Sequence, residues 1–159
     1  IDITSTVGKG TTVEVLFPKI DEKAPPKKKK EDELPTGNER ILLVDDEEHI
    51  RQFYSEELAD EGHKVWTRAT GHELLKTIDS LQPEVVVLDI RLVDYDGLDL
   101  LQEVRNKHHN LPVILCTAYD TYKENLKSIA ANYYVVKSFD LTELKLAIHR
   151  SIEAQTGQD

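Results

Sequence analysis

The sequence lacks the features of secreted and membrane-spanning proteins. Cys116 is the single cysteine among 159 residues, so no disulfide can form within the chain, and we expect a reducing compartment. No apolar run approaches the roughly 20 residues of a membrane span, and no signal peptide is visible. Methionine is absent even at the first position, where Ile1 stands, so we expect a piece of a longer protein. We therefore predict a cytoplasmic location and no membrane contact by these residues.

Basic residues are in deficit, and the deficit lies in one part of the chain. The sequence has 20 Lys and Arg against 30 Asp and Glu, which gives a formal net charge of −10. Residues 1–40 hold eight of each sign, so residues 41–159, with twelve basic and twenty-two acidic residues, carry the whole excess. Nucleic-acid binding needs Lys and Arg to neutralise phosphates, and we do not expect it here. An acidic domain suits a cation site and basic protein partners.

Composition divides the chain into a strand segment, a linker, one domain and a short tail. In residues 1–18 the sequence predicts a strand, because polar and apolar side chains alternate over residues 11–17 after a Gly-Lys-Gly turn. Residues 19–39 are rich in Lys, Glu and Pro and have few apolar side chains, which is typical of a flexible linker. Residues 40–155 contain regular apolar runs and form the predicted domain, and residues 156–159 form the tail.

The predicted domain alternates short apolar runs with amphipathic segments. The run Val85–Leu88, apolar and β-branched after Pro83, is typical of a buried central strand. Residues 47–61, with apolar side chains at helical spacing before Gly62, are typical of a helix. We predict strands over 40–45, 65–67, 84–89, 111–116 and 133–136, and helices over 47–61, 70–79, 98–107, 120–131 and 141–154, the last with Asp140 as its N-cap. Five βα units favour an α/β fold, a doubly wound parallel sheet with helices on both faces.

Polar side chains stand at the carboxyl ends of four of the predicted strands. Asp45 and Asp46 follow the first strand. Asp89 follows the third strand, Thr117 the fourth and Lys137 the fifth. In an open parallel sheet these ends lie along one edge, where ligands bind. Three acids, one hydroxyl and one ammonium at that edge indicate a site for a divalent cation and a phosphoryl group.

The neighbouring carboxylates of this edge require a compensating charge. Asp45, Asp46 and Asp89 would repel one another, and the pKa of at least one would rise unless a cation lies among them. Mg²⁺ prefers a few carboxylates and shares its other positions with water and phosphate oxygens. A carboxylate beside such an ion can attack a phosphorus atom, while the metal and an ammonium stabilise the charge on the phosphoryl oxygens.

With these motifs residues 40–155 resemble a response-regulator receiver domain of two-component signalling. The matching residues are Asp45-Asp46, Asp89, Asp96-Gly97, Thr117-Ala118, Tyr134 and Lys137. The resemblance implies a flavodoxin-like fold with the strand order 2-1-3-4-5. It also implies a phosphorelay function, in which a phosphohistidine passes its phosphoryl group to an aspartate.

The resemblance assigns a role to each residue of the predicted site. Asp89 would be the phosphoacceptor, and Lys137 and Thr117 would bind phosphoryl oxygens. Thr117 and Tyr134 would form a switch pair that changes the face made by the fourth helix, fifth strand and fifth helix. The implied Mg²⁺ ligands are Asp46 and Asp89 directly, Asp45 through a water, and the backbone carbonyl of Arg91.

The implied partner is a histidine-containing phosphodonor, either a kinase dimerisation domain or a phosphotransfer protein. The domain would be regulatory and would catalyse its own aspartyl phosphorylation and dephosphorylation. Two copies could pair through the face made by the fourth helix, fifth strand and fifth helix.

Three departures from the family pattern motivate an alternative function. Ser138 stands where the family usually has a proline whose peptide bond is cis, and Val93 replaces another usual proline. The stretch between Thr117 and Lys137 looks short by a residue or two. The alternative is a phosphorylation-silent interaction module with a receiver fold.

Residues 1–18 carry a resemblance of their own. Residues 5–12, Ser-Thr-Val-Gly-Lys-Gly-Thr-Thr, and the strand after them resemble the last hairpin of a histidine-kinase ATP-binding domain. The other motifs of that domain are missing from this sequence, so we expect no ATP binding and no kinase activity from this fragment. The implied parent is a hybrid histidine kinase with a C-terminal receiver.

Overall fold

The structure, a computed structural model, describes residues 2–6, 10–14, 38–122 and 130–157. The chain divides into two compact units, Ile1–Asp32 and Glu33–Asp159. In the first unit β1 (Asp2–Thr6) pairs antiparallel with β2 (Gly10–Glu14). The predicted strand is therefore present in part, and its residues 15–17 lie outside the described residues, as does most of the predicted linker.

The second unit alternates strands and helices in the predicted order. Its elements are β3 (Arg40–Val44), α1 (Glu48–Asp60), β4 (Lys64–Arg68), α2 (Leu74–Leu81), β5 (Val85–Leu88), α3 (Gly97–Lys107), β6 (Val113–Thr117), the 3₁₀ turn η1 (Asp120–Tyr122), β7 (Tyr133–Val136) and α4 (Thr142–Thr156). None of the helices among the described residues is long and apolar enough to cross a membrane.

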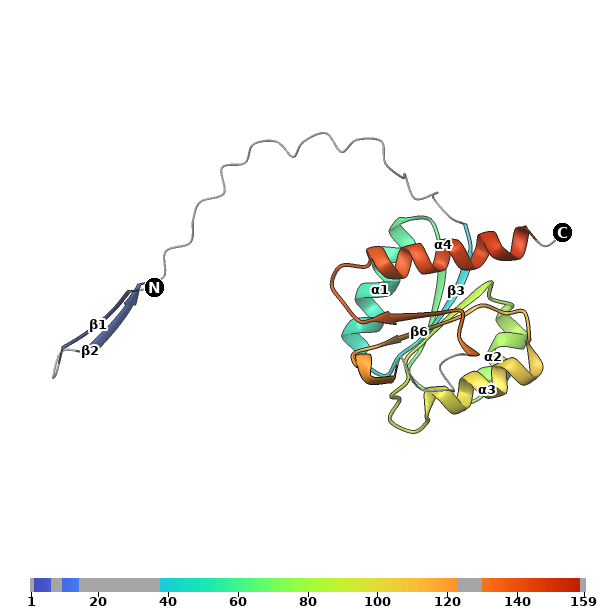
Figure 1. The fold of residues 1–159 in the computed structure, drawn as a ribbon, viewed down its shortest axis with the longest axis horizontal. Coiled ribbons are helices and arrows are strands. Elements are labelled where there is room, and N and C mark those ends of the chain that lie inside the picture. Colours follow the sequence, from blue (N-terminus) through green and yellow to red (C-terminus); the bar gives the residue numbers. More distant parts are fainter. Residues whose placement is uncertain (1, 7–9, 15–37, 123–129, 158–159) are drawn as a thin grey trace, which may run out of the picture. The chain divides into compact units, whose positions relative to one another are not determined.

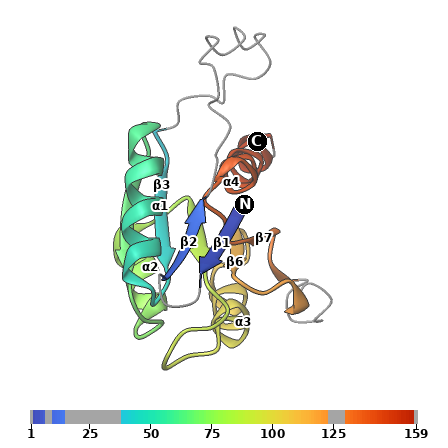
Figure 2. The same cartoon turned by 90° about the vertical axis from the view of Figure 1, so that its left-hand side faces the viewer.

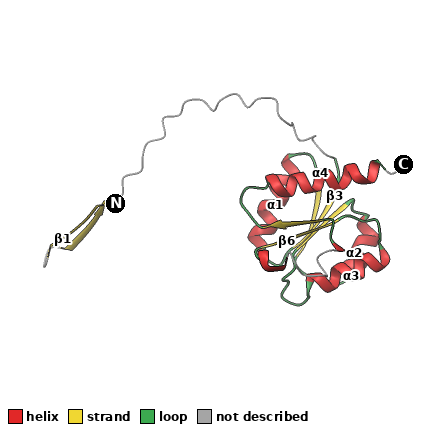
Figure 3. Ribbon diagram, viewed as in Figure 1, coloured by secondary structure: helices red, strands yellow, loops and turns green. Residues whose placement is uncertain are grey.

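The five strands of this unit form one parallel sheet in the order β4-β3-β5-β6-β7 (Figures 1 and 3). Counted from β3 as the first strand, this is the order 2-1-3-4-5, and the predicted fold class is confirmed. β3 and β5 pair with Val44 beside Leu88, so the residues that follow them, Asp45 and Asp89, leave the sheet at the same level. The order thus places the two acidic strand ends side by side.

Helices cover both faces of the sheet (Figures 1 and 2). Side chains alternate along β3: Ile41 and Leu43 pack with α1 and α4, while Leu42 and Val44 pack with α2 and α3. All four residues of β5 are fully buried. The continuous apolar run of β5 is what a strand needs when it is covered on both faces.

The second helix begins four residues later than predicted. Residues 71–73 form a turn, because Glu73 adopts a left-handed backbone (φ 53°) and the helix starts at Leu74. Gly71 is packed so closely that a Cβ atom there would lie 2.3 Å from Leu100 Cδ1. The helix ends before Gln82, which is also left-handed (φ 49°) and precedes a proline.

Other boundaries differ less, and one predicted element lies largely outside the described residues. The fourth strand is Val113–Thr117, two residues later at its start than predicted. The last helix begins at Thr142, and Leu141 holds its N-cap position; the carboxylate of Asp140 still accepts a hydrogen bond from the Thr142 backbone N–H at 2.9 Å. Of the helix predicted over 120–131, the structure describes the 3₁₀ turn η1, and residues 123–129 lie outside the described residues.

Candidate functional site

The carboxyl edge of the sheet collects four of the predicted site residues. Asp45, Asp89 and Thr117 are almost completely buried, with exposed fractions of 2%, 4% and 0%. Lys137 follows β7, and its side chain is 7% exposed. Since the flanking apolar strands bury these positions, each polar group must find a partner within the site.

Lys137 is the centre of this group. Its Nζ lies 2.7 Å from Asp45 Oδ2, 2.8 Å from Asp89 Oδ2 and 2.9 Å from Glu47 Oε1. An ammonium has three N–H donors and no acceptor, so three carboxylates satisfy it completely. The lysine therefore neutralises one of the three negative charges that the edge brings together.

Backbone groups fix the two buried carboxylates. Asp45 Oδ1 accepts a hydrogen bond from the Glu47 N–H at 2.9 Å, and the Arg51 guanidinium donates to the Asp45 carbonyl at 2.6 Å. Asp89 Oδ1 accepts from the Arg91 N–H at 3.2 Å. The remaining carboxylate oxygen of each aspartate is the one that points at Lys137.

The loop after Asp89 is shaped by a glycine. A Cβ atom on Gly97 would lie 2.2 Å from the Asp89 carbonyl oxygen and 2.7 Å from Ile90 Cα, so no other residue fits without moving backbone. Asp96 caps α3 by accepting a hydrogen bond from the Leu98 N–H at 2.8 Å. The Asp-Gly pair that the sequence singled out thus holds the loop against the phosphoacceptor candidate.

The hydroxyl of Thr117 has no hydrogen-bond partner among the described residues, although it is buried. Its backbone is held, because the Lys137 N–H donates to the Thr117 carbonyl at 2.8 Å. An unsatisfied buried hydroxyl costs about 1–3 kcal/mol. Such a group is a donor that a phosphoryl oxygen in this site could satisfy.

Burial and ion pairing shift the pKa values of this group in opposite directions. Burial raises the pKa of Asp45, and the hydrogen bond from Lys137 offsets this only in part. The hydrogen bond from Lys137 lowers the pKa of the exposed Glu47. Burial lowers the pKa of Lys137, but its bonds to Asp45, Asp89 and Glu47 outweigh this, and the net shift is upward. Burial of Asp45 thus outweighs its pairing with Lys137, and a further positive charge beside it would favour its ionised form.

Carboxylate oxygens of Asp45, Glu47 and Asp89 lie within 4.8 Å of one another. Hard oxygen donors at this spacing fit Mg²⁺, which takes one or two carboxylates and keeps several waters. Glu47 was not predicted to belong to the site; its place two residues after Asp45 was the available signal. Asp46, the predicted direct ligand, is half-buried and lies outside this group of three.

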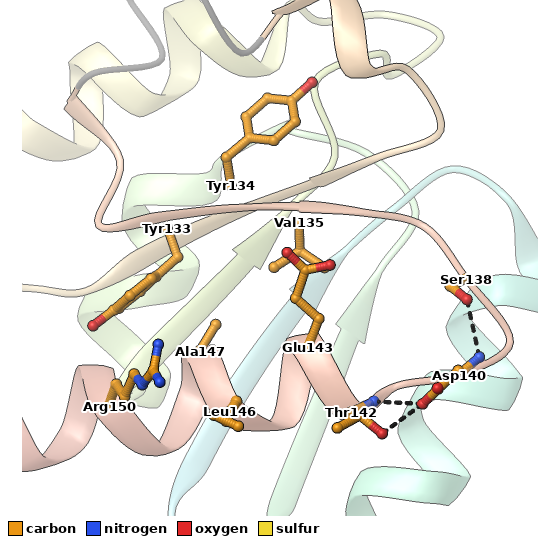
Figure 4. Close-up of a pocket in the computed structure, with 10 residues that line it drawn as sticks. All are labelled: Tyr133, Tyr134, Val135, Ser138, Asp140, Thr142, Glu143, Leu146, Ala147 and Arg150. Atoms are coloured by element: carbon orange, nitrogen blue, oxygen red, sulfur yellow. Dashed lines mark hydrogen bonds between the residues drawn. The ribbon is translucent and has the colours of Figure 1, made fainter.

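The predicted switch residue Tyr134 lies on β7 with its ring on the side away from α4 (Figure 4). Its hydroxyl donates to the backbone carbonyl of Tyr119, two residues after Thr117. The Tyr119 ring in turn lies against the Arg91 guanidinium, 5.0 Å from the ring centre. The described residues thus link the two predicted switch positions through the loop after β6.

The fold and the site together define a class of protein. A doubly wound sheet with a buried acid pair, an ammonium and an unsatisfied hydroxyl at its carboxyl edge is a domain built to accept a phosphoryl group on a carboxylate. Residues 41–149, well over half of the chain, match the family model described as the response regulator receiver domain, and the chain belongs to this family. It is a receiver domain of two-component signalling, a class of domain that is phosphorylated on aspartate.

Individual relatives support this assignment. The regulatory protein AtoC of Escherichia coli is 38% identical over 124 residues, which cover 76% of this chain and 27% of AtoC. The sensor kinase CckA of Brucella abortus is 32% identical over 164 residues, which cover 95% of this chain and 17% of CckA. The chain thus spans less than a third of the length of either curated relative.

Solved structures give the same assignment. The response regulator TrrA of Thermotoga maritima in complex with Mg²⁺ and BeF is 42% identical, with a TM-score of 0.69 over 71% of this chain and 98% of TrrA. A structure of TrrA in complex with the histidine kinase ThkA matches with 41% identity and a TM-score of 0.68, over 72% of this chain and 98% of the matched chain.

Alkaline pH is expected to destabilise the domain, because three buried groups of this region retain protons that the unfolded chain releases. Burial raises the pKa of Cys116 from 9.0 to about 12 and that of Tyr54 from 10.0 to about 12, and the pKa of Lys137 is also raised. The stabilisation is fully present when the pH is below the pKa values of these groups in the unfolded chain. It is lost as the pH rises through their pKa values in the folded protein. Each group contributes a slope of up to about 1.4 kcal/mol per pH unit.

The measurement is the urea midpoint as a function of pH between about 8 and 11. Cys116→Ala leaves a cavity and lowers the urea midpoint at every pH. In this variant the fall of the midpoint with rising pH should begin nearer pH 10 than pH 9. A decline with the same onset in both proteins would contradict the assignment of the first step to the buried thiol.

Proposed function

We propose that Asp89 is the phosphoacceptor of this receiver domain and that a phosphohistidine is its donor. The observation that carries the proposal is the Lys137 ammonium 2.8 Å from the buried Asp89 carboxylate, at a sheet edge where the buried Thr117 hydroxyl has no partner among the described residues. An Asp89 carboxylate oxygen forms a bond to phosphorus as the bond from phosphorus to the donor imidazole nitrogen breaks. The donor nitrogen keeps the electron pair of the broken bond, and because the other ring nitrogen of the phosphohistidine carries a proton, the donor leaves as a neutral imidazole.

The residues of the edge stabilise this transfer by charge. Lys137 is placed to bind a phosphoryl oxygen as negative charge spreads over the group, and Thr117 donates a hydrogen bond to another. When bound, Mg²⁺ supplies positive charge to the phosphoryl oxygens and compensates the buried acids. We assign Asp46, Asp89 and the Arg91 carbonyl as its direct ligands and Asp45 as a ligand through water.

Phosphorylation adds a charge of about −2 and strong acceptor oxygens to the end of β5. We propose that Thr117 then moves toward the phosphoryl group and that Tyr134 turns inward in the space that Thr117 leaves. The shift of an existing two-state balance would change the face that includes β7 and α4. That face has a groove of about 440 Å³ (Figure 4), lined by residues of β7 and α4 that include Tyr133, Leu146 and Arg150. A downstream partner or a second copy of the chain would bind there.

The parent protein is proposed to be a hybrid histidine kinase. The match to the sensor kinase CckA covers 95% of this chain, so it must include most of residues 1–39, whereas the match to AtoC covers 76%. The β1–β2 hairpin agrees with the end of an ATP-binding domain. Sequence upstream of Ile1 tests this origin: the absence there of an ATP-binding domain and a phosphorylatable-histidine helix would refute it.

A phosphorylation-silent interaction module is the competing function. Departures from the family pattern favour it: Ser138 follows Lys137 in place of a usual proline, and Val93, which replaces another proline in the loop after Asp89, is 82% exposed. It predicts weak Mg²⁺ binding and partner binding that ignores the state of Asp89.

The two functions are separated by treating the protein with beryllofluoride or acetyl phosphate in the presence of Mg²⁺. A receiver should show a change in tryptophan or tyrosine fluorescence and an acyl phosphate that hydroxylamine removes. If neither reagent has an effect with Mg²⁺ present, the receiver chemistry proposed for Asp89 is wrong for this chain.

The metal assignment is tested by comparing two neighbouring acids. Asp46→Asn should weaken Mg²⁺ binding by roughly 10-fold or more, because it removes a direct ligand. Glu47→Gln removes an exposed carboxylate and should weaken binding only by the loss of a screened charge. Isothermal titration with Mg²⁺ measures both, and Glu48→Gln, on the first turn of α1, is the matched control. A larger loss in Glu47→Gln than in Asp46→Asn would place Glu47, and not Asp46, in the coordination sphere.

A further inference from the structure

A tyrosine of α1 holds the backbone of the residue after Lys137. The Tyr54 hydroxyl donates to the Ser138 carbonyl at 3.0 Å and accepts from the Ser138 N–H at 3.0 Å. Two hydrogen bonds of this hydroxyl therefore go to the two backbone groups of a single residue, 84 positions away in the sequence, and the hydroxyl also interacts with the Cys116 thiol. A proline at position 138 could not take part in the second bond, since it has no N–H.

These bonds complete the fixation of the backbone around Lys137. On the other side the Lys137 N–H donates to the Thr117 carbonyl at 2.8 Å. The chain is thus fixed before the lysine side chain by β6 and after it by α1. A lysine side chain carries its ammonium on a flexible four-carbon stem, so the direction in which the ammonium points depends on how firmly its backbone is held.

Tyr54 is a buried and closely packed residue, as an anchor for the Ser138 backbone must be. It is 1% exposed and packs in the core between the sheet, α1 and α4 with Leu58 and Leu144. The neighbouring Phe53 meets the Tyr54 ring edge-on at 5.8 Å and the Phe139 ring at 6.0 Å. The residues after Lys137 are therefore tied to α1 by one hydroxyl and one pair of rings.

We propose that Tyr54 is a positioning residue for phosphoryl transfer to Asp89, because it holds the Ser138 backbone and thereby aims the Lys137 ammonium at the reacting oxygens. The inference rests on the proposed function and adds a residue to it. A buried tyrosine hydroxyl also needs a hydrogen-bond partner for its own sake. What favours positioning is that the hydroxyl bonds both backbone groups of the residue next to Lys137, in addition to its contact with the Cys116 thiol.

The test compares Tyr54→Phe, which removes only the hydroxyl, with Ser151→Ala. Ser151 is a matched control, because its buried hydroxyl donates to the Ala147 carbonyl within α4 at 2.8 Å and belongs to no part of the site. Both variants should lose similar stability. Tyr54→Phe should in addition slow phosphorylation by acetyl phosphate at saturating Mg²⁺ by roughly 10-fold, since misplacement of a charge-stabilising group costs rate. Ser151→Ala should keep the rate of the unaltered protein.

A second readout is independent of phosphorylation. The ¹H–¹⁵N signal of the Lys137 ammonium reports how firmly it is held, because its protons exchange slowly only while three carboxylates bind them. The signal should broaden or disappear in Tyr54→Phe and persist in Ser151→Ala. If the unaltered protein takes no phosphoryl group, the proposed function fails, and this signal alone decides the role of Tyr54. A Tyr54→Phe protein with an unchanged ammonium signal, or with an unchanged phosphorylation rate in a protein that does react, would overturn the proposal.

Discussion

Asp89→Asn is expected to abolish phosphorylation by phosphohistidine donors and by acetyl phosphate, with a loss of more than about 10³-fold in rate. The amide keeps the shape of the carboxylate, but it is no nucleophile. Since Asp89 is 4% exposed and its Oδ2 lies 2.8 Å from Lys137 Nζ, the amide also leaves the ammonium with one anion fewer. The readout is the hydroxylamine-sensitive acyl phosphate formed in the presence of Mg²⁺.

The control for this variant is Asp94→Asn. Asp94 is an exposed acid of the same loop, five residues further along the chain. The Asp94→Asn protein should be phosphorylated on Asp89 at the rate of the unaltered protein. Equal phosphorylation of Asp89→Asn and Asp94→Asn would move the phosphoacceptor elsewhere. Equal binding of a partner by both variants, without phosphorylation of either, would favour the silent interaction module.

Lys137→Met is expected to have the second largest effect, on both rate and stability. It removes the cation that, among the described residues, lies within 3 Å of both the Asp45 and the Asp89 carboxylates, so two buried carboxylates lose their ion-pair partner. Breaking a buried ion pair costs about 3–5 kcal/mol. The rate of phosphorylation should fall by roughly 10²-fold, because charge on the phosphoryl oxygens is no longer neutralised from that side.

The pH dependence of this variant distinguishes lost charge from lost packing. Without the ammonium, the raised folded-state pKa of Asp45 rises further, because only the backbone hydrogen bond from Glu47 then opposes burial and the Asp89 charge. A raised carboxyl pKa contributes stability that is present below the unfolded value of 3.8 and is lost as pH rises through the folded value. The deficit of Lys137→Met should therefore shrink as pH falls toward about 4, and Mg²⁺ should restore part of it at neutral pH.

Lys145→Met is the matched control for the second variant. Lys145 lies on α4 and pairs with Glu61 at 2.6 Å and Glu57 at 3.6 Å, away from the sheet edge. Its loss should cost about 1 kcal/mol or less and leave phosphorylation unchanged. Urea unfolding at several pH values measures both proteins. A deficit in Lys137→Met that is independent of pH and of Mg²⁺ would contradict the electrostatic account.

Local sequence patterns predicted the strands, the helices and the parallel sheet, because the period of apolar residues distinguishes a strand from a helix. Apolar runs predicted all five strands, and their alternation with helices predicted one parallel sheet. The strand order 2-1-3-4-5, which the family resemblance implied, is confirmed. Helix boundaries were less accurate. The turn before Leu74 depends on a left-handed Glu73 and on the close contact between Gly71 and Leu100, neither of which a helical pattern reveals.

The sequence by itself determined which residues reach the carboxyl edge, because a parallel sheet carries every strand end to the same side. Asp45, Asp89, Thr117 and Lys137 follow from that rule alone. Only the tertiary structure decided which groups touch there. The Glu47 carboxylate reaches Lys137 from the loop after β3, where the Glu47 N–H donates to Asp45 Oδ1. Tyr54 reaches Ser138 because α1 and α4 pack on one face of the sheet. These contacts depend on loop conformation and on helix packing between distant residues, which no local periodicity encodes.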